Sequence, residues 1–433
     1  MSFLKVLGQR HLAILWSSQV LSAIGDYLYS IAVIWLAVKV AGSAAGIVAA
    51  AQAGSALLFG LLGGVYADRW NRRKTMMIVD LARAAAVGVL PILALTGTLR
   101  LWHLVIVAVI VGSLGALFDP ALQASLPTLT GDARILQAAN GLMDVTRRLA
   151  RALGPSLAGA LIILFPLAHF FTLDAISFVI SSLAVFALGS HFAWKPEVPK
   201  GQASNARSIP GEIAGAIRLA RGHTPIAWML ATNWLVALAW SAAFTVGIPL
   251  LADHTLGGSV GVYGLIVGAY GVGNVISNLI IGSVTIHRRV LVMLLGRLIV
   301  GGGFLLMVSV PVLPVALLGS ALAATGGPMA DIPLLMMIQT DLPSNQIGKV
   351  YSLDMVLEYG GSALGLLLAI PLFHYLNPVP GIIICALAIA LTSVAGLARF
   401  GFVEPAMRAG ERQPEHPLTP PEEREQDFSS QNS

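Results

Sequence analysis

The chain has 433 residues, of which 56% are hydrophobic and 11% are charged, and its formal net charge is +5. Because soluble domains contain about 25% charged residues, this composition excludes a water-soluble globular protein. The single cysteine, Cys385, excludes a framework of disulfide bonds within the chain.

Apolar runs of helical length recur along almost the whole sequence. A run of about 20 residues is long enough to cross the hydrocarbon core of a bilayer as a helix, so we predict an all-α membrane protein with twelve transmembrane helices. The first six are expected near residues 12–38, 45–66, 75–96, 102–125, 138–164 and 168–189. The second six are expected near residues 226–251, 260–284, 290–310, 313–338, 348–372 and 379–402.

Two polar stretches divide the chain into units. Residues 191–224 carry several basic side chains and predict a cytoplasmic central loop between two six-helix bundles, 1–190 and 225–402. Residues 403–433 are rich in Pro, Glu and Gln and predict a disordered cytoplasmic tail.

The placement of Lys and Arg predicts the orientation. With the N-terminus inside, only Lys39 and Arg100 fall in the outer loops, while the cluster at 69–74 and the central loop fall inside. We therefore expect both termini in the cytoplasm of a multi-pass protein of the bacterial inner membrane. Most basic residues fall on the side predicted to be cytoplasmic, so the net positive charge gives no reason to expect a nucleic-acid partner.

The two sets of spans share a weak internal repeat. Six helices followed by six related helices are typical of transporters whose substrate site lies between the halves, near the bilayer midplane. Three charged residues recur with an offset of roughly 210–220 residues: Arg83 with Arg297, Asp119 with Asp331, and Asp144 with Asp354.

The loop between the second and third predicted spans carries the most specific motif. Residues 63–74 contain Gly64, Asp68, Arg69, Arg72 and Arg73. This stretch resembles the signature loop of the major facilitator superfamily, G-x-L-A-D-R-x-G-R-[RK]. The resemblance implies the twelve-helix major facilitator fold and a latch that closes the cytoplasmic side when the transporter faces outward. The alternative is a basic loop that only anchors topology, which gives Asp68 no role.

Three further stretches narrow the resemblance. Residues 18–26, 120–127 and 140–159 resemble the branch that holds the enterobactin exporter and the macrolide-efflux proteins. The last one approximates the antiporter motif G-x-x-x-G-P-x-x-G-G, with Ala150 and Ala158 replacing two glycines. The fourth span lacks the arginine that serves proton coupling in many drug exporters, so that route does not carry over.

Ionisable residues inside the membrane are costly and usually functional. Asp26 lies about 15 residues into its span, roughly 22 Å from the inner end at 1.5 Å per residue, and we expect it to face a central cavity and carry a proton. The alternative is a carboxylate capped by Ser22 or Ser30. Asp119 and Asp331 lie beside prolines in equivalent spans, where they bind a cation, carry protons, form a gate or serve a water-exposed structural role.

Charges on the fifth and eleventh predicted spans suggest a cytoplasmic gate. Asp144, Arg148 and Arg151 share one helix face, because they are spaced at i, i+4 and i+7. Asp354 and Glu358 lie on the corresponding face of the eleventh span. The alternative is that the arginines extend to the inner headgroups.

Three other expectations concern the remaining polar and aromatic side chains. We expect Arg83 to form an internal pair, for example with Asp80 one turn before it, or to be a partner for the loop of Asp68; the alternative is a substrate contact. We expect Asp174 to lie at the outer membrane interface. The residues Asn233, Trp240 and Phe244 share a face of the seventh span and line a cavity for an amphipathic ligand, or pack as ordinary core.

Motifs for enzymatic chemistry are absent from the sequence: it contains no phosphate-binding loop, no H-E-x-x-H and no C-x-x-C. We predict no enzyme, no cofactor and no metal. The predicted function is secondary active export of amphipathic small molecules of the drug or siderophore class by a monomer in membrane lipid, with proton antiport. The alternatives are a lysophospholipid flippase, uptake of a polar nutrient, and a non-transporting membrane sensor.

Overall fold

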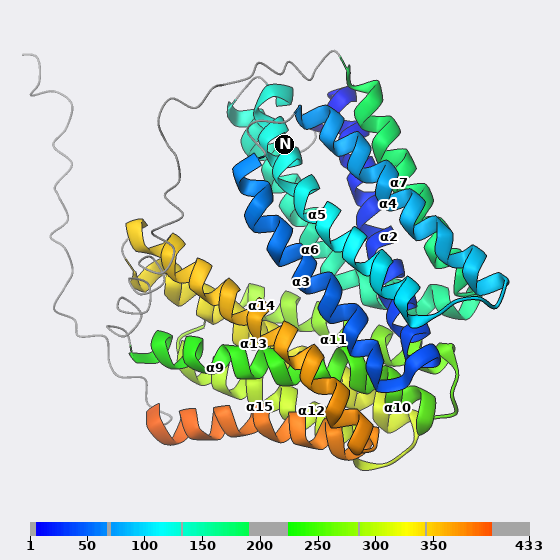
Figure 1. Cartoon of the computed structure of the whole chain (residues 1–433). Coiled ribbons are helices and arrows are strands. Elements are labelled where there is room, and N and C mark those ends of the chain that lie inside the picture. Colours follow the sequence, from blue (N-terminus) through cyan, green and yellow to red (C-terminus); the bar gives the residue numbers. More distant parts are fainter. Residues whose placement is uncertain are drawn as a thin grey trace, which may run out of the picture.

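The computed structural model describes residues 6–66, 71–130, 133–189, 224–284, 286–342 and 344–400, and these are helical without strands (Figure 1). The first helix set consists of α2 (Arg10–Ala41), η1 (Gly42–Ala44), α3 (Ala45–Tyr66), α4 (Arg72–Leu95), α5 (Leu101–Thr130), α6 (Ala133–Leu164) and α7 (Ala168–Ala187). The second helix set consists of α9 (Thr224–Ser241), η4 (Ala242–Gly247), α10 (Ile248–His254), α11 (Val260–Ser283), α12 (Arg289–Ser309), α13 (Leu313–Asp341), α14 (Ser344–Tyr375) and α15 (Pro378–Phe400).

Ten stretches of the described residues have the length and apolar composition of a membrane span. The first stretch, Arg10–Gly60, contains α2 and most of α3, and α6 is not among the ten. Between residues 134 and 151, α6 carries four arginines, which lower its apolar character. The helices lie close to the predicted spans, whereas the count of twelve crossings stays a prediction.

Large apolar side chains cover the outside of the helices. Leu58, Leu183 and Leu318 are each at least 60% exposed, although they lie within long helices. In water such a surface would drive association, whereas in lipid it is the expected solvent-facing surface. Because each helix satisfies its own backbone hydrogen bonds, the fold suits a multi-pass membrane protein.

Small residues bring the helices close together inside each set. At Gly296 of α12, an added Cβ would lie 2.7 Å from the carbonyl oxygen of Gly326 on α13. In lipid there is no hydrophobic driving force for the association of helices, and close packing of their backbones stabilises the contact instead.

Among the described residues, the two helix sets pack against each other toward one end. There α3 packs against α14, α6 against α11, and α2 against α10. One core cluster spans both sets at this end and includes Trp35 and Tyr263, whose rings stack at 5.3 Å. Lys39 at the end of α2 also forms an ion pair with Asp253 of α10.

The sets separate toward the opposite end. A second core cluster, with Leu15 and Met76, lies wholly in the first set, and a third, with Met229 and Met293, lies wholly in the second. Figure 1 shows the two sets diverging from the shared end, so that the start of α2 lies far from the start of α9. The described helices of the two sets therefore lie apart at the end that contains these two helix starts.

Candidate functional site

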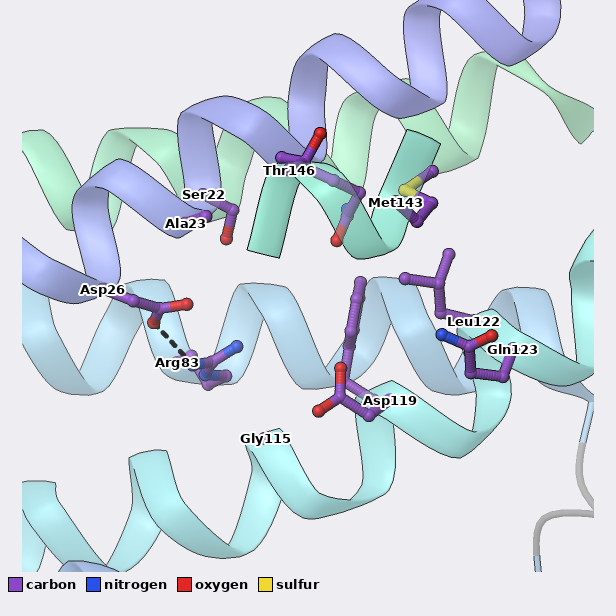
Figure 2. A pocket seen from close by; sticks show the side chains of 12 residues that line it. Ser22, Ala23, Asp26, Arg83, Gly115, Asp119, Leu122, Gln123, Met143 and Thr146 are labelled. Carbon is purple, nitrogen blue, oxygen red and sulfur yellow. Dashed lines mark hydrogen bonds and ion pairs between the residues drawn. The ribbon is translucent and has the colours of Figure 1, made fainter. Parts of the chain in front are cut away.

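A cavity of about 230 Å³ lies inside the first helix set. Its walls come from α2, α4, α5 and α6 (Figure 2). Polar and apolar side chains alternate around it, as in sites that hold amphipathic ligands. The lining residues are Gln19, Ser22, Ala23, Asp26, Arg83, Gly115, Phe118, Asp119, Leu122, Gln123, Met143 and Thr146.

Asp26 forms an ion pair with Arg83 at the edge of this cavity. The Nη2 of Arg83 donates to Oδ1 of Asp26 at 2.8 Å, as the dashed line in Figure 2 marks. The Asp26 side chain is 42% exposed and that of Arg83 only 10%. The guanidinium lies over the ring of Phe178, with its central carbon 4.0 Å from the ring centroid. Ion pairing and the aromatic face together offset the cost of burying the arginine.

Two further carboxyl groups lie on the sealed side of Arg83. Asp80 of α4 is 1% exposed and Asp174 of α7 is fully buried. Ser177 donates a hydrogen bond to the backbone oxygen of Asp174 at 2.8 Å, and Ser181 is hydrogen-bonded to Asp80. Arg83 therefore pairs with Asp26 across helices, although Asp80 on its own helix was the partner suggested by sequence spacing.

The predicted partners Asp119 and Asp331 do not share this cavity. Asp119 of α5 lines it near Asp26 and Arg83 (Figure 2). Asp331 is an exposed residue of α13 in the second helix set. The structure thus brings Asp119, and not Asp331, to the Asp26 site.

Arg297 occupies in the second set the position that Arg83 has in the first, and it is 2% exposed. Its guanidinium donates to Oγ1 of Thr232 at 2.6 Å and to Oδ1 of Asn233 at 3.3 Å. The amide of Asn233 in turn donates to Asp354 at 2.7 Å. Asn233 therefore belongs to a buried polar network and Asp354 is held inside the second set.

An aromatic cluster lies farther along the same span. Trp240 and Phe244 stack with centroids 4.8 Å apart, and the indole nitrogen of Trp240 donates to the hydroxyl of Tyr270 at 3.0 Å. The backbone widens into a π-helical turn at Ala242–Gly247, a feature found frequently at functional sites. Trp240 and Phe244 are partly buried against the shared core, and neither lines the cavity at Asp26.

Comparisons with known proteins agree with this arrangement. The MFS_3 family, described as transmembrane secretion effector, matches residues 1–429. The multidrug efflux pump Tap of Mycolicibacterium fortuitum is 30% identical over 80% of this chain and 85% of its own length. The macrolide efflux protein A of Streptococcus pyogenes is 30% identical over 40% of this chain and 42% of its own. A bacterial homologue of the iron transporter ferroportin, solved in an inward-facing state, has a TM-score of 0.64 at 16% identity and covers 89% of this chain and 98% of its own.

The chain belongs to the MFS_3 family. It is a major facilitator transporter of the efflux branch and not an enzyme, which confirms the resemblance that the sequence motifs indicated. Membrane-length helices and this family together make it a multi-pass protein, located in bacteria in the cell membrane.

The signature loop of this MFS_3 protein is described only in part. Asp68 and Arg69 lie outside the described residues, and Gly64 is placed only as a backbone position in α3. Arg72 donates to the carbonyl oxygen of Ala124 at 2.6 Å, and Arg73 donates to that of Phe186 at 2.7 Å. Both arginines thus bind helices of their own set in this arrangement.

The predicted charges of α6 are placed by backbone alone. Asp144, Arg148 and Arg151 lie on this helix, but their side chains fall outside the described residues. On the facing helix, Glu358 is exposed and Asp354 binds Asn233. The gate across the two sets therefore stays a prediction.

Asp174 is the site residue that sequence reasoning missed. We expected it at the outer membrane interface, whereas it is fully buried beside α2. A signal was present, because Asp174, Ser177 and Ser181 recur at i, i+3 and i+7 and form one polar stripe on α7. The position of Asp174 along its span indicates its depth in the membrane, but only the polar stripe indicated which face of α7 is buried.

Proposed function

We propose that this protein exports amphipathic small molecules of the drug class by alternating access, in exchange for protons that bind at Asp26. The observation that carries the proposal is the cavity in the first helix set, where the half-exposed carboxylate of Asp26 pairs with the buried Arg83. The names of relatives such as Tap and macrolide efflux protein A support a drug-like substrate. A siderophore-class substrate is the second ligand class to test.

The proposed topology has twelve spans in two six-helix bundles, with both termini in the cytoplasm. In this orientation the end where the sets separate faces the cytoplasm, so the described arrangement faces inward. The ion pair between Lys39 and Asp253 then closes the outer side. A substrate that enters from the cytoplasm reaches the Asp26 cavity without crossing that closed end.

Competition between proton and substrate follows from the charge at Asp26. The ionised carboxylate binds Arg83, and protonation removes one charge of the pair and weakens it. An amphipathic molecule whose polar group contacts the cavity favours one of these two charge states. Substrate binding and proton binding are therefore linked, and binding of one releases the other.

The proposed cytoplasmic gate would close when the sets rock about the shared end. Asp68, Arg69, Arg72 and Arg73 of the signature loop, with the charges of α6, would then meet the second helix set. Asp354 and Glu358 of α14 are the proposed partners. Because Asp354 now binds Asn233, closing requires that hydrogen bond to be exchanged.

Proton release on ligand binding tests the proposal. Purified protein in weakly buffered detergent receives macrolides, siderophores or lysolipids, and the pH change is recorded. We expect one ligand class to release protons from the wild-type chain and from Asp341→Asn, a control remote from the cavity. We expect the same ligand to bind Asp26→Asn without proton release.

Other outcomes would replace the proposal. If a ligand binds and neither wild type nor Asp26→Asn releases protons, coupling at Asp26 is wrong. Binding of lysolipids alone would favour a lipid flippase. A silent Asp26→Asn variant that retains full gradient-driven export would place the proton site elsewhere.

A further inference from the structure

The side of Arg83 that faces away from the cavity is enclosed by a polar seam between α2, α4 and α7. The seam consists of Tyr29, Asp80, Arg83 and Asp174, and α7 packs against both other helices. In the described part of the chain, eight buried side-chain nitrogen or oxygen atoms have no hydrogen-bond partner. Four of them are in the seam: the Tyr29 hydroxyl, Oδ2 of Asp80, Nε of Arg83 and Oδ2 of Asp174. Buried polar atoms without partners are rare because each is costly, so this concentration marks a functional feature.

The charges of the seam do not balance if every carboxyl is ionised. Arg83 stays protonated under all ordinary conditions, and Asp26 satisfies it as a carboxylate at 2.8 Å. Asp80 and Asp174 are sealed from solvent and have no ion-pair partner among the described residues. A buried, unpaired carboxylate is strongly disfavoured and takes up a proton instead. The seam and Asp26 together are neutral when Asp26 is ionised and both Asp80 and Asp174 are protonated.

The groups around the seam do not change this balance. On α2 the facing titratable groups are Asp26 and Tyr29, on α4 they are Asp80 and Arg83, and on α7 the group is Asp174. From α5, Asp119 adds a further acidic group across the cavity (Figure 2). These described helices bring one cation, Arg83, to the cluster, so its positive charge can satisfy one carboxylate at a time.

The backbone of α2 lets Asp174 approach this cation. A Cβ added to Gly25 would lie 2.6 Å from Oδ1 of Asp174, so only glycine allows the carboxyl to sit against α2 at this point. Gly25 directly precedes Asp26. Phe178, one helical turn after Asp174, lies against the guanidinium of Arg83, whose central carbon is 4.0 Å from the ring centroid. Asp26 therefore binds Arg83 from the cavity side, while Asp174 lies against the neighbouring Gly25, on the helix whose Phe178 contacts the same guanidinium.

We propose that Asp174 is the alternative partner of Arg83 and stores the proton that neutralises Asp26. In the step, the O–H bond of Asp174 breaks and the same proton forms the O–H bond of Asp26. The guanidinium of Arg83 then donates to the new carboxylate of Asp174 instead of Asp26. The total charge of the cluster is unchanged, and Asp80, hydrogen-bonded to Ser181, stays neutral throughout. The inference rests on the proposed function in one respect, because it takes Asp26 as the residue that presents the proton to the cavity.

Infrared spectroscopy of the purified full-length chain tests this without any transport assay. Protonated carboxyl groups give a C=O stretching band that shifts in heavy water. We expect Asp80→Asn and Asp174→Asn each to remove one component of this band. We also expect Asp26→Asn to remove the Asp174 component although residue 174 is unchanged, because Asp174 then loses its proton and its carboxylate binds Arg83. The spectrum of Asp26→Asn should therefore match that of the double variant Asp26→Asn/Asp174→Asn.

A second variant separates the switch from simple burial. Gly25→Ala displaces Asp174 from α2, so in Asp26→Asn/Gly25→Ala the Asp174 component should remain. Persistence of that component in Asp26→Asn alone would overturn the exchange of partners. An unchanged band in Asp174→Asn would show that Asp174 carries no proton, and a band that depends on sodium would assign the site to a metal cation. Because no substrate is present, failure of drug–proton exchange would refute the proposed function and leave this result standing.

Discussion

At the residue scale, the pair of Asp26 and Arg83 is the feature on which the account depends. Arg83→Met removes the cation and leaves Asp26 without a partner, while Arg83→Lys keeps the charge but loses the planar contact with Phe178. We expect losses in the free energy of unfolding of about 1.5–3 kcal/mol for Arg83→Met, the range for hydrogen bonds to charged groups, and less for Arg83→Lys. Thermal unfolding in detergent measures both.

The double variant Asp26→Asn/Arg83→Met is the matched test of that pair. Because it removes both charges, its loss in the free energy of unfolding should be smaller than the sum of the losses in the two single variants, as expected for residues in contact. Strict additivity of the two substitutions would contradict a direct pair.

The sequence indicated both Asp26 and Arg83 as notable residues inside the membrane, but it did not indicate that they pair with each other. Their depth in the membrane follows from chain position, which is why Asp26 was expected at a cavity. The partner of Arg83 depends on how α2 and α4 both pack against α7, and 57 residues separate the two side chains. The same limit explains Asp174, whose burial depends on a close approach to Gly25 on a distant helix.

At the element scale, helix positions were predictable because the bilayer sets their length. The predicted span 45–66 matches α3 (Ala45–Tyr66), and 313–338 falls within α13 (Leu313–Asp341). The contacts between the sets were not predictable, because apolar composition does not distinguish a lipid-facing glycine from one that touches another helix. Gly159 of α6, which lies against Gly264 of α11, is such a case.

Gly159→Ala tests the contact of α6 with α11. An added Cβ would clash with the carbonyl oxygen of Gly264, whereas at Gly302 of α12 it would meet no atom within 4 Å. Overpacking costs about 1–3 kcal/mol, so Gly159→Ala should disfavour the described arrangement and Gly302→Ala should not. Distances between spin labels at Val40 and His254 report the closed end. Equal distance distributions in the two variants would contradict this contact.

At the scale of the whole molecule, two helix sets that meet at one end suit the alternating access that we propose, in which the Asp26 site is reached first from one side of the membrane and then from the other. One core cluster joins the sets, and two separate clusters stabilise each set alone. In the alternating access that we propose, rocking about the shared end would change contacts between the sets and leave the Asp26 cavity intact, because all its walls belong to the first set. The repeat and the signature loop predicted such an architecture, whereas the end at which the sets meet depends on packing that no local pattern encodes.

Transport in proteoliposomes under an imposed pH gradient tests the central claim most directly. A macrolide is the first substrate, and the wild-type chain is compared with Asp26→Asn in vesicles of the same lipid. The account predicts that the gradient drives substrate movement by the wild type, and that Asp26→Asn exchanges substrate across the membrane without responding to the gradient. Gradient-driven transport by Asp26→Asn at the wild-type rate, or wild-type transport that ignores the gradient, would contradict it.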